Sequence, residues 1–292
     1  MPVDTTSSDI RTEQIPNTMS CENGIPYGTG PSNDAVGAII AENVAGNNYT
    51  PTNIPDTRDS QGKTPEERGA DIIRFFKGKS LAGRPLHSEF AFAVAGVWGA
   101  ESGINTWQYN SNEQRTGGYV SGVHTTNSYG NYKGNKLYHT EENMKRYGYG
   151  KGVAQWSWER NLLFKDWYNS GAGGTEKPFP TMDENASAIT ATSVSNQTGF
   201  AWKEMQERTG EFASVVNSIN HADPGSEAFK SNILKCVDAV TRGFENGSSV
   251  KMRSAESMNA YKGGYESELK KRCEWALGLY EKLKDNRDLT DW

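Results

Sequence analysis

The feature that most constrains this chain is the apolar run from Phe90 to Ala100, inside the segment EFAFAVAGVWGAESG. A helix formed by such a continuous run has no polar face, so it must be buried on most sides. The run is too short to span a membrane, as is every other apolar run in the chain. We therefore expect a domain built around one buried helix, which begins near Ser88 and ends at Gly103.

Further helical patterns lie on both sides of this run. Thr64, Pro65 and Glu67 form a capping-box pattern, which predicts a helix that starts after Thr64 and runs through Phe76. Four later segments are also predicted to be helical. They are ERNLLFKDWY, FAWKEMQER, SEAFKSNILKCVDAVTRGF and YESELKKRCEWALGLYEKL. The last two carry apolar stripes at helical spacing, namely Phe229, Ile233, Val237, Val240 and Phe244, and Leu269, Cys273, Ala276 (or Leu277), Tyr280 and Leu283.

The segment from Thr106 to Gly150 has a different composition, rich in Gly, Asn, Tyr and Ser. Short runs between turn residues predict a small antiparallel sheet or a long ordered loop there. A loop of this length inside a domain is usually functional. The expected fold class is therefore α+β and predominantly α-helical.

Three regions are expected along the chain. Residues 1–63 are rich in Ser, Thr, Asn, Pro and Gly without a sustained period, which predicts an extended polar arm that makes assembly contacts. Residues 64–286 hold the helical patterns and form the folded domain. Residues 287–292 are expected to be a short C-terminal tail.

Charge and cysteine content exclude several classes of function. The formal net charge of −5 argues against bulk binding to nucleic acid, which needs clustered lysines and arginines. Cys21, Cys236 and Cys273 are too few and too scattered for a disulfide framework or a zinc site, so no metal or cofactor is expected. Cys236 and Cys273 could meet, although buried free thiols are the favoured interpretation. Met1 to Ser20 lacks the features of a signal peptide, and no membrane insertion is expected.

Glu101 is the first candidate for chemistry. Burial against Trp98 and the negative end of the helix dipole both disfavour its charged form, so the sequence predicts a carboxyl that keeps its proton near neutral pH. A glycosidic general acid requires that property. Spacing alone favours the alternative, an exposed glutamate that ends a helix and is solvated.

The second candidate is the cluster YGYGKGVAQWSWER. Gly148, Gly150 and Gly152 let the backbone approach a ligand closely, and Gln155 offers both a donor and an acceptor to a sugar. Trp156 supplies a ring face on which a sugar could pack. The alternative is a glycine-rich turn that leads into the next helix, with its tryptophans in the core.

Together the two clusters resemble the lysozyme-like superfamily, and most closely the phage tail lysozyme family. The matching residues are Glu101-Ser102-Gly103-Ile104-Asn105, Tyr149-Gly150, Gly152-Val153-Ala154-Gln155-Trp156 and Arg160. The segments FAWKEM and AVTRGFEN and the final helix match further family segments in order, so the resemblance runs from about Thr64 to Leu283. Val97-Trp98-Gly99-Ala100 departs from the family pattern before the acid, and the Gly-rich segment is longer than expected.

This resemblance implies a lysozyme-like fold of two lobes, with a glycan groove between them and a small Gly-rich β or loop region. It implies that Glu101 is the catalytic acid and that Ser102, Tyr149, Gln155 and Trp156 lie in the groove. A second carboxylate is not assigned. Glu113, Glu141 and Glu142 are candidates, each more simply explained as a solvated loop charge. We expect a single acid, an activated water and inversion at the anomeric carbon.

The expected function is a virion-associated peptidoglycan hydrolase that cuts the β-1,4 glycan bond and opens the host wall when phage DNA enters. Its expected partners are glycan strands and, through residues 1–63, other proteins of the phage tail or baseplate. Three alternatives remain open: an inactive, wall-binding subunit of the tail, a lytic transglycosylase, and a free endolysin. A peptidase is disfavoured because no Cys–His or zinc arrangement is suggested by the spacing.

Overall fold

The structure is a computed structural model and describes residues 49–56, 58, 62–106, 150–156, 159–171, 192–245 and 255–292. Its helices are α2 (Pro65–Phe76), α3 (Ser88–Ser102), α6 (Glu159–Asn169), α8 (Val194–Glu207), α9 (Thr209–Ser218), α10 (Glu227–Val240), the π-helix η4 (Thr241–Glu245), α11 (Ala255–Leu283) and α12 (Arg287–Thr290). Strands β1 (Ser80–Leu81) and β2 (Arg84–Pro85) pair as one antiparallel hairpin. The described chain is mostly helical with a tiny sheet, which confirms the predominantly α-helical prediction.

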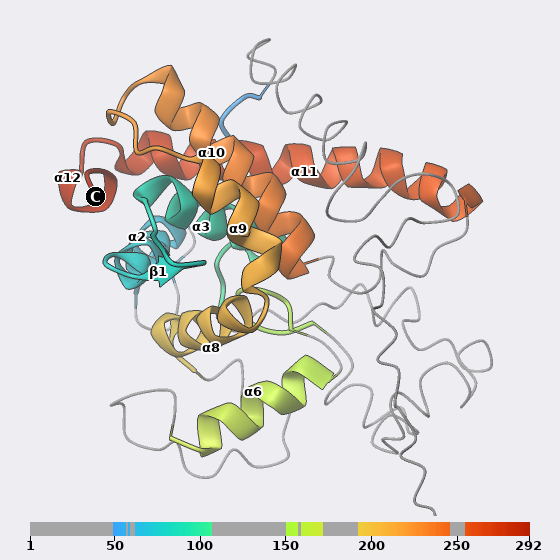
Figure 1. Cartoon of the computed structure of the whole chain (residues 1–292). Coiled ribbons are helices and arrows are strands. Elements are labelled where there is room, and N and C mark those ends of the chain that lie inside the picture. Colours follow the sequence, from blue (N-terminus) through green and yellow to red (C-terminus); the bar gives the residue numbers. More distant parts are fainter. Residues whose placement is uncertain are drawn as a thin grey trace, which may run out of the picture.

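Helix α3 lies at the centre of the fold, packed against α2, α10 and α11 (Figure 1). Its side chains are buried from Ser88 to Gly99, as the continuous apolar run predicted. Two glycines let α11 come close. An ideal Cβ on Gly96 would lie 2.3 Å from the Ala276 Cβ, and one on Gly99 would lie 2.3 Å from the Trp275 ring. Any larger residue at either position would push α3 and α11 apart.

Helix α2 begins as its sequence predicts. The Thr64 hydroxyl accepts from the Glu67 backbone at 3.2 Å, and the Glu67 carboxylate accepts from the Thr64 backbone at 2.7 Å. This reciprocal capping box satisfies two backbone donors that a helix start leaves open. Helix α3 ends at Gly103, which takes the left-handed conformation, as predicted.

Aromatic rings join α6 and α8 to the central helix. Trp98 of α3 contacts Trp156 and the η4 residue Phe244, with ring centroids 6.4 and 5.9 Å apart. Trp156 in turn contacts Phe164 of α6 and Phe200 of α8 at 5.5 and 5.7 Å. All five rings are buried in one continuous hydrophobic core. These five aromatic side chains therefore pack in the core, and for Trp156 this agrees with the alternative interpretation of its cluster.

Two segments that the sequence assigned to an arm and a tail pack onto the helical body. Residues 49–56 lie along α11, where Ile54 enters the core. At the other end, Leu289 is fully buried, and the Ser88 hydroxyl donates to the Thr290 carbonyl at 2.8 Å. Trp292 packs against the core as well.

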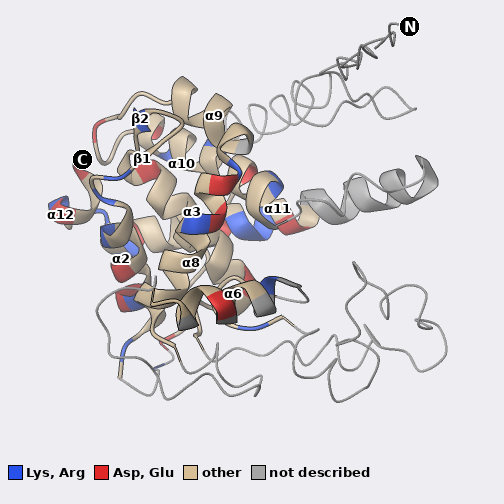
Figure 2. Ribbon diagram, turned by 60° about the horizontal axis from the view of Figure 1, so that its bottom comes forward, with Lys and Arg blue, Asp and Glu red and all other residues tan. Residues whose placement is uncertain are grey.

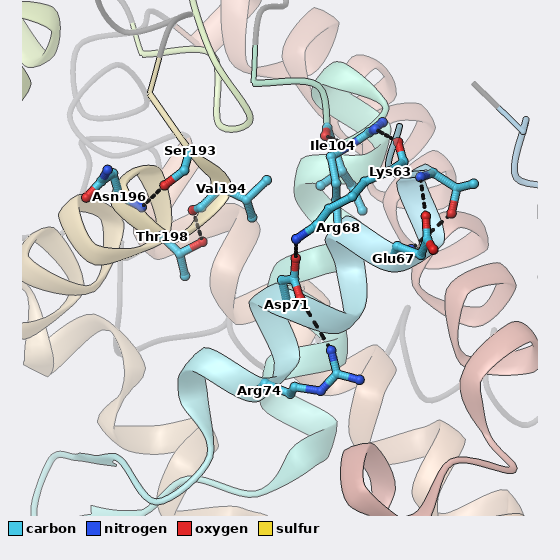
Figure 3. Close-up of polar contacts among 11 residues, drawn as sticks. Lys63, Glu67, Arg68, Asp71, Arg74, Ile104, Ser193, Val194, Asn196 and Thr198 are labelled. Atoms are coloured by element: carbon cyan, nitrogen blue, oxygen red, sulfur yellow. Dashed lines mark hydrogen bonds and ion pairs between the residues drawn. The ribbon is translucent and has the colours of Figure 1, made fainter. Parts of the chain in front are cut away.

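Other differences from the sequence are local. Both predicted apolar stripes of α10 and α11 are buried in full. Helix α8 begins earlier than its FAWKEMQER pattern, because the Ser193 side chain accepts from the Asn196 backbone and caps it (Figure 3). Helix α9 and the β1–β2 hairpin were not predicted. The expected sheet or loop between Thr106 and Gly150 lies outside the described residues, and the two-lobe arrangement stays a prediction.

None of the helices in the described ranges combines the length and apolarity needed to cross a membrane.

Candidate functional site

Glu101 lies in the last turn of α3 and faces a buried cation. Its side chain is 23% exposed, and its partner, Arg272 of α11, is 7% exposed. The Arg272 Nε donates to Glu101 Oε1 at 3.0 Å, and the Nη2 of the same guanidinium also donates to that oxygen. The sequence predicted apolar surroundings for this carboxyl group, whereas the structure sets an arginine against it. Arg272 could not be paired with Glu101 from spacing, because the two lie 171 positions apart in the sequence.

The two oxygens of the Glu101 carboxyl group have different surroundings. Oε1 accepts both bonds from Arg272. Oε2 accepts no hydrogen bond from any residue within the described ranges. Oε1 is therefore occupied, and Oε2 is the oxygen of this carboxyl group that is left to accept a hydrogen bond.

The backbone turns sharply directly after Glu101. Gly103 and Ile104 both take the left-handed conformation, with φ of 67° and 55°. For a β-branched residue this costs about 1–3 kcal/mol. Fully buried Arg68 of α2 holds the turn, and Figure 3 shows it beside Ile104. The Arg68 Nε donates to the Ile104 carbonyl at 2.6 Å, and its Nη2 donates to Asn105 Oδ1 at 2.8 Å. Strain of this kind persists only where surrounding contacts enforce it, and it is concentrated at functional sites.

Ser102 and Gln197 tie the end of α3 to the turn at 151–156. Ser102 is buried, and its Oγ lies 2.8 Å from the Val153 carbonyl oxygen. The Val153 N–H donates to Gln197 Oε1 at 2.8 Å, and Gln197 Nε2 donates to the Thr106 carbonyl at 3.1 Å. The structure therefore brings together the two motifs that the sequence singled out, the Glu101 helix end and the Gln155–Trp156 segment.

Of the two residues of this turn that were predicted to lie in a groove, Gln155 is the one that retains exposure. Lys151 and Trp156 close the turn through two backbone hydrogen bonds of 3.0 and 2.9 Å. Gln155 stands between them in a left-handed conformation with φ of 49°. Its Nε2 donates to the Gly152 carbonyl at 2.9 Å, and its side chain is partly exposed. It therefore presents an amide group beside the end of α3.

Trp156 supports the site from inside. Its side chain is fully buried, and its indole Nε1 donates to Glu204 Oε2 at 2.8 Å. Arg160 holds the same carboxylate with two bonds of 2.8 Å each and lies over the Phe244 ring. The Trp156 ring thus has no face open to solvent, and Ser102, at 6% exposure, is nearly as enclosed. Both side chains lie inside the folded body in this structure, and their place in a groove stays a prediction.

Four of the predicted site residues lie outside the described residues. These are Tyr149, Glu113, Glu141 and Glu142. Their roles in the groove or as a second carboxylate stay predictions.

Sequence reasoning missed the buried polar residues that support the site. One signal for Arg272 was present, since it precedes Ala276 and Tyr280 at four-residue spacing on the stripe of α11. Glu204 stands inside the FAWKEM segment but gave no sign of pairing with Trp156 and Arg160. For Arg68 and Gln197 no signal existed, because each binds backbone groups far away in the sequence.

Cys236 and Cys273 are free and buried, which confirms the favoured interpretation. Burial raises the pKa of both thiols well above its usual value. Among the residues that the structure describes, no group of His, Cys, Asp and Glu side chains is placed to hold a metal ion. In the ribbon of Figure 2, the positions of acidic and basic residues are interspersed along the described helices.

Comparison of the chain with models of protein families, with characterised proteins and with solved structures gives no match. The assignment of function therefore depends on the site itself.

Proposed function

We propose that this protein is a peptidoglycan hydrolase that cleaves the β-1,4 glycan bond with Glu101 as general acid. The observation that carries the proposal is the asymmetric Glu101 carboxyl group. Arg272 fixes Oε1, whereas Oε2 accepts no hydrogen bond within the described chain, on a side chain that is partly exposed. The neighbouring turn presents the Gln155 amide, a group suited to a sugar hydroxyl or acetamide.

The proposed reaction needs one proton transfer from Glu101. Protonated Glu101 gives its Oε2 proton to the glycosidic oxygen, and the bond from that oxygen to the anomeric carbon breaks. Water adds to the carbon and releases a proton to the solvent, from which Glu101 takes up a proton before the next turnover. The Arg272 guanidinium then stabilises the carboxylate that remains, as a charge-assisted pair does. Preorganised charge of this kind costs no rearrangement during the reaction.

A second candidate is an inactive, wall-binding subunit of a phage tail. The same ion pair favours it, because Arg272 and Glu101 also join α11 to the end of α3 and could be retained for stability alone. Under this proposal Glu101 has a structural role. The protein would bind wall fragments and break no bond.

Glu101→Gln separates these candidates when it is assayed for release of soluble fragments from purified peptidoglycan. The hydrolase proposal predicts a loss of about 10²–10⁴-fold, the usual contribution of a general acid. Glu274→Gln of α11 is the matched control, because its side chain is also 23% exposed. Equal release by the parent, Glu101→Gln and Glu274→Gln would exclude Glu101 as the acid, and no release by the parent would favour the wall-binding role.

Mass spectrometry of the released ends tests the reaction type. Hydrolysis leaves reducing ends, whereas a lytic transglycosylase, which uses the same acid, leaves anhydro-muramyl ends. The proposed location is the phage tail. Detection of the chain in purified virions supports that location, and its absence from them favours a free endolysin.

A further inference from the structure

Residues 49–56, called the strap below, dock on the backbone of α11. The Thr52 N–H donates to the Glu274 carbonyl at 3.0 Å, and Ile54 is buried in the core. In Figure 1 the strap is the blue segment beside α11. The sequence placed these residues in a polar arm, so their contact with the folded body is new information from the structure.

Gly278 of α11 shows that this docking is specific. An ideal Cβ at this position would lie 2.3 Å from the Thr52 carbonyl oxygen and 3.2 Å from its nitrogen. Only glycine therefore lets the strap backbone reach the helix backbone. Glycine is a poor residue for the interior of a helix, so its presence here serves the strap and not α11 itself.

The strap also covers Cys273. The Tyr49 side chain hydrogen-bonds the Cys273 thiol, which is fully buried. Cys273 directly follows Arg272 along α11. The strap thus contacts Cys273, Glu274 and Gly278, while Arg272 and Ala276 of the same turns face α3.

We propose that the strap is a positioning segment for the Glu101 site. It clamps α11 against α3 and thereby keeps the Arg272 guanidinium on the Glu101 carboxyl group. Thr52 and Gly278 are its positioning residues. Detachment of the strap from α11 would therefore loosen this ion pair.

Gly278→Ala is the sharpest variant, because alanine stabilises the helix while its Cβ collides with Thr52. Gly210→Ala in α9 is the matched control, since nothing lies within 4 Å of an ideal Cβ there. Thr52→Pro removes the backbone donor, and Thr52→Ala keeps it. All four are made in the full chain with Cys21→Ser, so that Cys273 and Cys236 are the remaining thiols.

The first readout is the rate of thiol alkylation at each cysteine, measured by mass spectrometry. We expect Gly278→Ala and Thr52→Pro to raise the Cys273 rate about tenfold or more through local opening of the strap. Cys236 should stay protected in every variant, which shows that the body remains folded. Protection of Cys273 in both variants would overturn the docking role of the strap.

The second readout is a double-mutant cycle of Gly278→Ala with Glu101→Gln, followed by chemical unfolding. If the strap holds the ion pair, the effect of Glu101→Gln on the free energy of unfolding shrinks in the Gly278→Ala background. The same effect in both backgrounds would contradict the coupling. Neither this cycle nor alkylation requires enzymatic activity, so each tests the strap even if the proposed function fails.

The third readout depends on the proposed function. In the chain that retains Glu101, Gly278→Ala should lower kcat roughly tenfold, because Glu101 is displaced from its catalytic position. KM should stay nearly unchanged, because the turn at residues 151–156 is not altered. Gly210→Ala should retain the parental kcat. An unchanged kcat with an exposed Cys273 would overturn the positioning role.

Discussion

At the scale of single residues, the orientation of the Glu101 carboxyl group depends on Arg272. Glu101 is oriented by one buried guanidinium, which contacts it through two nitrogens. Lysine at the same place would offer one ammonium instead of the flat, two-nitrogen edge of arginine. The identity of residue 272 should therefore matter beyond its charge.

Arg272→Lys should lower turnover of peptidoglycan by roughly tenfold or more, and Arg272→Ala should lower it further. Arg272→Ala should also reduce the free energy of unfolding by about 1–3 kcal/mol, because it leaves a partly buried carboxylate without its donor. Steady-state kinetics and urea unfolding measure the two effects. Lys271→Ala is the control, since Lys271 is 57% exposed and pairs with Glu268 at the surface. Equal behaviour of Arg272→Ala and Lys271→Ala would contradict this role.

At the scale of helices and strands, the helix ends and buried faces that depend on neighbouring residues could be predicted from the sequence. The capping box of α2, the end of α3 at Gly103 and the buried stripes of α10 and α11 all follow from patterns within one or a few turns. Helix α9 was not predicted, although its residues carry an amphipathic pattern. The turn of the β1–β2 hairpin depends on Ala82, which takes a left-handed φ of 53° that alanine does not indicate.

The capping box of α2 predicts a pH-dependent contribution to stability. The hydrogen bond from the Thr64 backbone is the main cause that lowers the pKa of Glu67 from its ordinary value of 4.5. A lowered folded pKa means that the contribution is fully present above that value and is lost as pH falls through the lower, folded value. Glu67→Gln keeps a cap acceptor but removes the charge.

We expect Glu67→Gln to have a lower melting temperature than the parent at pH 7 and the same melting temperature at pH 2. Thermal unfolding followed by circular dichroism across this range measures the difference. A gap between parent and variant that is constant from pH 7 to pH 2 would contradict the assignment.

At the scale of the whole molecule, both ends of the described chain pack on the central helices. The strap packs on α11. Helix α12 is held to the end of α2 by the C-cap residue Lys77, whose Nζ lies 2.8 Å from Asp288 Oδ1. These contacts join residues more than 200 positions apart, and the compositions of the arm and the tail gave no sign of them. The same limit applies to Arg68, Gln197 and Arg272, whose partners are set by packing and not by neighbouring residues.

The C-terminal segment should therefore contribute to stability. Leu289→Ala should reduce the free energy of unfolding by about 2–5 kcal/mol, since it removes a fully buried side chain. Asp285→Ala, an exposed neighbour, should change it by less than about 0.5 kcal/mol. Urea unfolding of the two variants measures both changes. An unchanged free energy of unfolding in Leu289→Ala would show that this segment does not stabilise the fold.

The structure of the Glu101→Gln variant bound to a peptidoglycan oligosaccharide tests the central claim most directly. We expect a glycosidic oxygen within about 3 Å of the side-chain atom that replaces Oε2, the reach of a proton transfer, with the Gln155 amide against an adjacent sugar. Arg272 should remain on the atom that replaces Oε1. A sugar bound away from residue 101, or a glycosidic oxygen that only Arg272 contacts, would contradict the account.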